Sequence, residues 1–229
     1  MHVVSVKDNG TLALHDGHSL QLESVLLPAG PADHGPRIFR DRAIAALDNL
    51  AAGHQIVAAA RSPLKDRYGR IEAQIFLPNN AENDWLQVAI LEQGLGRVFV
   101  TPDRPECVGA LFAAERAARE QHAGIWAVPE YAVRTPDALT PRDKGTFQIV
   151  EGKVVHATVK SGRGYLDFGE DWKSDFTAAI GPDCIKAFRA LGIDPRHYEG
   201  HTIRVRGWID EYHGPEIDVA APQDIEFVQ

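Results

Sequence analysis

Residues 66–77 have the sequence DRYGRIEAQIFL, and this stretch decides how the first half of the chain is interpreted. Its first five residues are typical of a tight turn, because aspartate and glycine both accept the backbone angles that a turn requires. The seven residues that follow, 71–77, are rich in apolar and aromatic side chains and predict a strand. A strand that begins directly after a tight turn indicates a compact, β-rich structure.

The chain on the N-terminal side of this turn predicts a β-meander followed by a helix. Residues 3–7, 11–15 and 19–27 are expected to be strands, with turn signals at 8–10 and 16–17. Residues 37–52 have the spacing of apolar side chains that favours a helix, and Gly53 is a suitable end for it. Residues 54–60 predict one further strand.

Beyond the turn, the sequence predicts two more helices, over residues 84–93 and 105–122, separated by a short extended segment at 97–100. The element order therefore indicates a β-rich α+β fold. We expect a small five-stranded barrel of the OB-fold type that carries three helices.

Three segments in this half resemble the staphylococcal nuclease (thermonuclease) family. They are DRYGR at 66–70, WLQVAILEQGLGRV at 85–98 and AAERAAREQHAGIW at 113–126. The resemblance covers residues 2–127, and we take residues 1–127 as the first domain. It implies a helix-decorated OB-fold barrel and calcium-dependent hydrolysis of phosphodiesters.

The resemblance also implies which positions form the active site. The family uses an aspartate in the turn after the first strand, an R-x-x-x-x-D-x-P-E segment, and the arginine that ends a D-x-x-G-R turn. Carboxylates hold the cation, the glutamate acts on water, and the arginines neutralise charge in the transition state. Pro28 aligns the segment here, and only the last arginine, Arg70, is retained. The other family positions are occupied by Gly10, Gln21, Leu26 and Ala29.

These replacements predict a degenerate site with no metal and no cofactor. A leucine at a metal position removes an oxygen ligand, and loss of the base, the metal ligands and one arginine together is expected to abolish the family mechanism. Calcium enters only under the alternative that neighbouring acids supply new ligands, the candidates being Asp8, Glu23, Asp33 and Asp41.

Prolines and charged residues over 128–145 predict a linker, and residues 146–229 predict a second OB-fold-like domain. The expected strands are 147–160, 165–169, 175–180, 201–211 and 216–228, with a helix at 183–191. The segments 150–155, 165–172 and 203–208 resemble a C-terminal module found in some bacterial thermonuclease-family proteins. That resemblance implies an architecture rather than an activity.

A candidate binding face follows from the period of two in the strand 203–209. Ile203, Val205 and Ile209 take one side of this strand. The other side, together with neighbouring segments, contributes the residues of the candidate face: Tyr165, Arg163, Lys173, Arg204, Arg206 and Trp208. Aromatic and cationic side chains in this arrangement are typical of single-stranded nucleic-acid binding. The alternative is structural, since residues 146–229 contain 9 Lys and Arg against 14 Asp and Glu.

Composition excludes several classes of protein. The 229 residues carry 24 Lys and Arg against 32 Asp and Glu, a net charge of −8, with 44% hydrophobic residues. This composition excludes a chain that is disordered throughout, a chain with a membrane-spanning segment, and a basic protein that coats nucleic acid non-specifically. Cys107 and Cys184 have no zinc-site spacing, and whether they form a disulfide is left open. The chain shows no export signal, so a periplasmic or secreted location requires a signal that has been removed; otherwise we expect a cytoplasmic protein.

The leading hypothesis is therefore a non-catalytic binding or scaffold protein whose partner is another protein. Two alternatives remain open. One is a divergent metal-dependent nuclease built around Arg70. The other is a single-stranded nucleic-acid-binding protein that uses the second domain.

Overall fold

The structure is a computed structural model that describes residues 1–61, 65–66, 68–78, 84–102, 107–171 and 173–228. The chain divides into two compact units. Unit 1 comprises residues 1–99 and 106–131, and unit 2 comprises residues 100–105 and 132–229. Within the described residues, no helix is long and apolar enough to cross a membrane.

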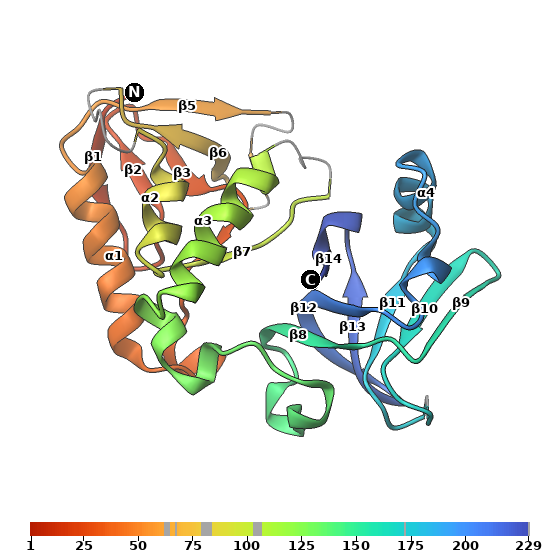
Figure 1. Ribbon diagram of the computed structural model, residues 1–229. Helices are drawn as coiled ribbons and strands as arrows, with labels where there is room; N and C mark the ends of the chain where they lie inside the picture. The colour runs from red at the N-terminus through yellow and green to blue at the C-terminus, as the bar shows by residue number, and fades with distance from the viewer. Residues whose placement is uncertain (62–64, 67, 79–83, 103–106, 172, 229) are drawn as a thin grey trace. The chain divides into compact units, whose positions relative to one another are not determined.

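A five-stranded sheet forms the centre of unit 1 (Figure 1). Its strands, in spatial order, are β1 (Val3–Val6), β2 (Leu12–Leu14), β3 (Ser19–Leu22), β6 (Ile71–Phe76) and β5 (Val57–Ala60). The neighbours are antiparallel except β3 and β6, which are parallel. An isolated bridge between His2 and Gln55 joins the start of β1 to the segment that precedes β5. The two edges of this sheet therefore approach each other.

Three helices pack beside this sheet, as the sequence predicts (Figure 1). They are α1 (Arg37–Ala51), α2 (Leu86–Glu92) and α3 (Val108–Glu120). In α1 the buried residues are Phe39, Ala43, Leu47 and Ala51, a spacing of four that places them on one side of the helix. The predicted start of the third helix, at 105–106, lies outside the described residues.

Buried polar side chains fix the helices to the strands. The amide of Gln87, in α2, accepts from the backbone nitrogen of Ile75 at 3.1 Å and donates to the carbonyl of Ala73 at 2.8 Å. In α3, Glu115 accepts from the backbone nitrogen of Val98 at 2.6 Å. Val98 belongs to β7 (Arg97–Val98), which pairs with β4 (Val25–Leu26).

The described residues of unit 2 form seven strands and one α-helix, α4 (Pro182–Ala190). The strands are β8 (Phe147–Lys153), β9 (His156–Lys160), β10 (Arg163–Asp167), β11 (Thr177–Ile180), β12 (Thr202–Tyr212), β13 (Gly214–Val219) and β14 (Ile225–Phe227). Their spatial order is β14-β12-β13-β11-β10-β9, and β8 also pairs with β12. The core includes Leu166, Phe176, Phe188, Val205 and Ile217.

Two single strands predicted in unit 2 are each divided in the structure. The segment 147–160 leaves β12 and joins β10, because the nitrogen of Val154 bonds to His201 while that of Val155 bonds to Asp167. The segment 216–228 is interrupted by a 3₁₀ turn at Pro222–Asp224. Proline has no N–H to give to a sheet, and Asp224 accepts the N–H groups of Ala220 and Ala221 instead.

The segment predicted as a linker, 128–145, is folded. Its first residues belong to unit 1, where the Tyr131 side chain is buried. Its later residues lie against β8. The nitrogen of Arg134 bonds to the carbonyl of Ile149 at 2.8 Å, and the nitrogen of Glu151 bonds to the carbonyl of Arg134 at 2.8 Å.

The two units share one pairing scheme. In each, three consecutive strands form an antiparallel meander, namely β1-β2-β3 and β9-β10-β11. The third strand then pairs in parallel with the last strand of a hairpin, as β3 with β6 and β11 with β13. No sheet of the described residues closes as a continuous ladder, so barrel closure stays a prediction.

Candidate functional site

Arg70 lies at the end of the turn that precedes β6, and Asp66 fixes its position. The carboxylate of Asp66 accepts from the backbone nitrogens of Tyr68 and Arg70 at 2.8 and 2.9 Å, and from Nε and Nη2 of Arg70 at 2.8 Å each. Desolvation raises the pKa of Asp66, but the hydrogen bonds from Arg70 and Tyr68 outweigh it, so this pKa lies below its usual value. The turn therefore presents a preorganised guanidinium.

Gln21, at the predicted position of the family's first arginine, is directed at the same guanidinium. Nη1 of Arg70 donates to Oε1 of Gln21 at 3.1 Å, and Oγ1 of Thr11 donates to that oxygen at 3.4 Å. The Arg70 guanidinium also lies over the Tyr68 ring, 5.0 Å from its centroid. The replacement thus exchanges a second positive charge for a neutral acceptor.

A pocket of about 400 Å³ opens beside this arrangement. Its lining is polar and contains two cationic side chains and no carboxylate, the residues being Lys7, Asn9, Thr11, Ser19, Tyr68, Gly69 and Arg70. The ammonium of Lys7 donates to the hydroxyl of Ser19 at 3.4 Å. A concave site with this lining can bind an anion.

The positions aligned with the family's acids carry no oxygen ligand for a cation. Gly10 has a φ of +79°, and a Cβ there would lie 2.3 Å from Cδ1 of Leu27. Leu26 is in β4 and pairs with Arg97. The backbone nitrogen of Ala29 donates to the carboxylate of Asp33 at 3.0 Å. At the positions that the resemblance assigns to the family's acids, the side chains present therefore offer no oxygen atom.

The four candidate replacement acids do not line the Arg70 pocket. Asp33 is 7% exposed and forms an ion pair with Arg97 at 3.1 Å. Glu23 is buried. Asp8 and Asp41 line a different hollow, on the α1 side. Among the described residues, no group of three His, Cys, Asp or Glu side chains is arranged to hold a metal ion.

The candidate binding face of unit 2 is only partly brought together. Arg163 and Tyr165 are in β10 and Trp208 is in β12, where its side chain is 50% exposed. Arg204 is bound to Glu151 of β8, with Nε 3.0 Å from Oε2. Lys173 is exposed in the loop between β10 and β11.

Arg206 is buried, so the prediction that it contributes to the candidate binding face is wrong. Its side chain is 1% exposed and its Nη2 lies 2.6 Å from Oε1 of Glu226. The sequence shows which side of β12 Arg206 takes, but not that β14 pairs with β12 and brings an acid to it. The register of β14, with Glu226 opposite Arg204, explains this burial.

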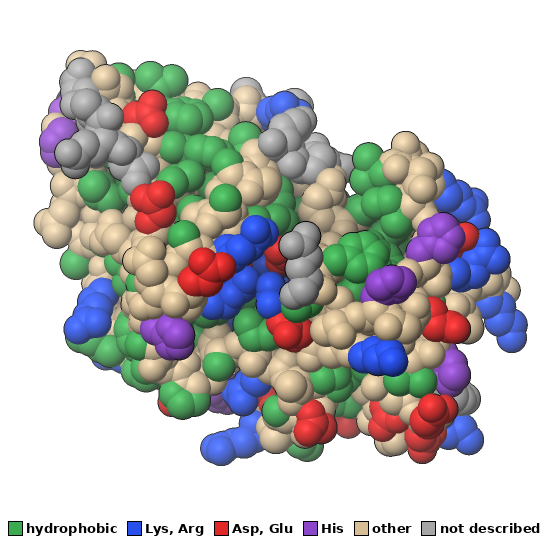
Figure 2. Space-filling view, viewed as in Figure 1, with side chains coloured by type: hydrophobic (Ala, Val, Ile, Leu, Met, Phe, Trp, Pro, Cys, Tyr) green, Lys and Arg blue, Asp and Glu red, His purple; other side chains and the backbone are tan. Residues whose placement is uncertain are grey.

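Asp210 lies two residues from Trp208 in β12, and β13 adds further carboxylates that the period of two in the strand 203–209 does not indicate. Glu216 in β13 is paired with Asp210 in β12, and Asp218 follows on the same side of β13. Burial raises the pKa of Glu216, Asp218 and Asp210 raise it further and Arg163 lowers it, so that the net pKa is about 7. Figure 2 shows acidic and basic side chains interspersed over the visible surface.

The two cysteines differ in environment. Cys184 is a free thiol, buried in α4 with a pKa raised by desolvation to about 12, while Cys107 is half-buried at the start of α3. A thiol with so high a pKa is a poor nucleophile. It belongs to the core rather than to a reactive site.

Comparison with known proteins places residues 31–128 within the family model described as staphylococcal nuclease homologue. No curated protein sequence matches the chain. The matched span contains Arg70 and runs from the 3₁₀ turn before α1 to the segment after α3, whereas Gly10, Gln21, Leu26 and Ala29 precede it. The chain therefore contains a domain of the staphylococcal nuclease homologue family.

Proposed function

We propose that this chain is a binding protein in which the nuclease-like domain retains an anion pocket and has lost the means to hydrolyse a phosphodiester. The observation that carries the proposal is the pairing of Arg70 with Asp66 and Gln21 in a pocket without a carboxylate. A preorganised guanidinium beside Lys7 and Tyr68 favours a bound anion. It does not by itself activate water.

The lack of room at Gly10 supports the same proposal. An aspartate at this position would meet the Leu27 side chain and would need a left-handed backbone. Asp33, the candidate acid in the 3₁₀ turn before α1, already accepts hydrogen bonds from Arg97, Tyr131 and the backbone of Ala29. A carboxylate that already accepts from three donors cannot also serve as a cation ligand without breaking some of these hydrogen bonds.

For unit 2 we propose an OB-type barrel, on the strength of the pairing scheme that it shares with unit 1. We also propose that the partner is a protein. Both halves are acidic, with 12 Lys and Arg against 15 Asp and Glu in residues 1–127. The burial of Arg206 and the engagement of Arg204 leave fewer cations available to a nucleic acid than the sequence pattern predicts.

The second candidate function is a divergent nuclease, which the family match favours. The test is hydrolysis of fluorogenic single-stranded DNA and RNA in calcium, in manganese and in chelator, beside an Arg70→Ala variant. We expect no cleavage above background under any condition. Metal-dependent cleavage that is lost in the Arg70→Ala variant would overturn the proposal and establish the nuclease.

A binding measurement tests the retained pocket separately. Titration with inorganic phosphate, followed by NMR of the backbone amides of residues 66–70, is expected to shift these amides in the parent protein and not in Arg70→Ala. Arg61→Ala, a charge-matched change outside the pocket lining, is the control. Equal shifts in all three proteins would show that the pocket is not an anion site.

A further inference from the structure

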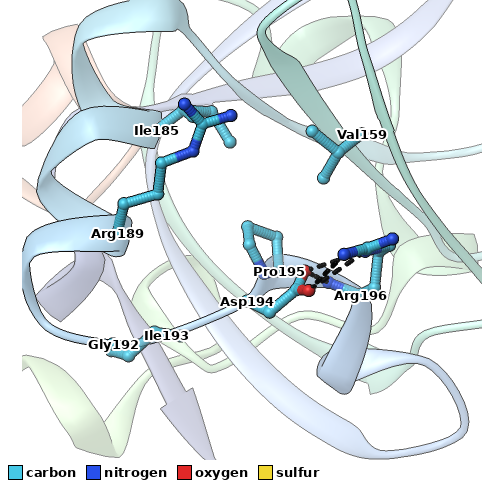
Figure 3. Close-up of a pocket in the computed structure, with 8 residues that line it drawn as sticks. All are labelled: Val159, Ile185, Arg189, Gly192, Ile193, Asp194, Pro195 and Arg196. Atoms are coloured by element: carbon cyan, nitrogen blue, oxygen red, sulfur yellow. Dashed lines mark hydrogen bonds and ion pairs between the residues drawn. The ribbon is translucent and has the colours of Figure 1, made fainter.

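Unit 2 contains a hollow of about 400 Å³ between β9, α4 and the segment that follows α4 (Figure 3). This volume falls within the range of roughly 300–1,000 Å³ that is typical of small-molecule sites. One group of its lining residues is apolar and comes from three separate elements, namely Val159, Ile185, Ile193 and Pro195. Ile185 belongs to the core, and Val159 and Ile193 pack against it. The apolar wall is therefore continuous with the rigid interior of the unit.

The charged residues of the lining are arranged asymmetrically. Figure 3 shows Asp194 and Arg196 joined by dashed lines on one side, with Arg189 on the α4 side and no line reaching it. Arg196 donates to Asp194 through Nη2 at 2.6 Å and through Nε at 3.0 Å. The hydrogen bonds from Arg196 lower the pKa of Asp194 to about 2, so this pair stays ionised and neutral as a whole. Arg189 therefore carries the net charge of the hollow.

The net charge of +1 in the lining of this hollow contrasts with the rest of unit 2, because residues 146–229 contain 9 Lys and Arg against 14 Asp and Glu. The surrounding negative charge disfavours polyanions. One available guanidinium beside an apolar wall matches a monovalent carboxylate, which a guanidinium binds through two parallel hydrogen bonds. A phosphate dianion is disfavoured because Asp194 lies in the same lining.

We propose that this hollow, which we call the α4 pocket, binds a carboxylate carried on a short apolar stem. Arg189 holds the carboxylate, and Val159, Ile185, Ile193 and Pro195 enclose the stem. Such a group is found both on a free organic acid and at the C-terminal residue of a polypeptide. The chemistry recognised is the same in both.

The experiment is an NMR titration of the full chain with two pairs of probes. The first pair is 4-methylpentanoate and its neutral amide, and the second is N-acetyl-alanyl-leucine and the same dipeptide with an amidated C-terminus. We expect both carboxylates to shift the amides of residues 189–196, and both amides to bind at least tenfold more weakly. The tighter of the two carboxylates identifies the source.

Two variants and a control test the assignment of residues. Arg189→Gln, at an exposed position, is expected to weaken carboxylate binding at least tenfold. Lys186→Gln removes the same charge from the same helix at a residue outside the lining, and is expected to change affinity less than twofold. Val159→Trp fills the hollow and is expected to block both carboxylates while Arg189 remains.

Three results would overturn the proposal. They are equal binding of a carboxylate and its amide, unchanged affinity in Arg189→Gln, and the absence of shifts over residues 189–196 at 50 mM probe. Competition with inorganic phosphate is the remaining test. Displacement of 4-methylpentanoate by an equal concentration of phosphate would also contradict the assignment, because it would identify a general anion site.

Discussion

The hydroxyl of Tyr131 donates a hydrogen bond of 2.9 Å to Oδ1 of Asp33, although 98 positions separate the two residues. The other carboxylate oxygen, Oδ2, accepts from Arg97 at 3.1 Å and from the nitrogen of Ala29 at 3.0 Å. A buried carboxylate is stable only when its oxygens are satisfied in this way. The segment after α3 is thereby fastened to the turn before α1.

Tyr131→Phe is expected to lower the free energy of unfolding of unit 1 by about 1–3 kcal/mol, because it leaves one oxygen of a buried carboxylate without its donor. The edge-on contact of this ring with Phe39 remains in the variant, so the change isolates the hydroxyl. Urea unfolding followed by tryptophan fluorescence measures the difference. Tyr212→Phe, at a residue that is 70% exposed, is the matched control, with an effect below about 0.5 kcal/mol. Equal effects of the two substitutions would contradict a stabilising role for the hydrogen bond.

Gly10 and Gly53 allow the backbone and steric costs of a side chain to be separated. Their φ values are +79° and +75°, but only at Gly10 do atoms lie within 4 Å of an added Cβ, the nearest being Cδ1 of Leu27. Gly53→Ala is expected to cost about 1 kcal/mol for the left-handed backbone alone. Gly10→Ala is expected to cost about 1 kcal/mol more, because the half-buried Leu27 side chain must move. Thermal unfolding of both variants measures the difference; equal costs would mean that an acid can be accommodated at Gly10 after all.

The ion pair between Arg206 and Glu226 is expected to be structural. Glu226→Gln removes the carboxylate that lies 2.6 Å from a guanidinium nearly inaccessible to water, and we expect a loss of about 2–4 kcal/mol in unit 2. Glu211→Gln, which breaks the exposed pair with Lys144, is expected to cost less than about 1 kcal/mol. Chemical denaturation of both variants provides the comparison. Similar losses would show that Arg206 is more hydrated than its burial indicates, and would restore it to the candidate binding face.

Local patterns predicted most of the elements of unit 1. The apolar spacing of residues 37–52 and the turn signals at 8–10 and 66–70 act within a few residues, so each can be recognised without its partners. The three predicted helices of this unit are confirmed, with bounds that differ by no more than two residues where the structure describes the predicted bound. The nuclease resemblance is confirmed over residues 31–128.

What the sequence did not predict depends on contacts between distant residues. The division of 147–160 into β8 and β9 is set by a change of partner strand, from β12 to β10. The burial of Arg206 depends on Glu226, twenty residues away. The α4 pocket is likewise formed by residues from β9, α4 and the following turn, none of which forms a local motif. Such features follow from register and packing, which a period in one strand does not specify.

Glu216 provides a prediction about pH. Its pKa in the folded protein is about 7, against 4.5 for an unperturbed glutamate, because burial and the neighbouring Asp218 and Asp210 disfavour its charge. Between these values the folded protein retains a proton that the unfolded chain has released. The free energy of unfolding therefore falls as pH rises from 4.5 through 7, and the contribution is fully lost above that range.

Glu216→Gln removes this titration, since the amide is neutral at every pH. The difference in unfolding free energy between the variant and the parent protein is the quantity that depends on pH. It is expected to favour the variant by about 1–2 kcal/mol more at pH 8 than at pH 5, once partial solvation of the side chain is allowed for. Asp218→Asn is expected to move the transition of Glu216 to lower pH, because it removes the like charge with the larger effect on this pKa. Glu120→Gln, at an exposed acid in the other unit, is expected to change stability equally at both pH values. Urea unfolding of unit 2 at pH 5 and pH 8 measures these differences, and a Glu216→Gln effect that does not depend on pH would mean that this carboxylate is already ionised at pH 5.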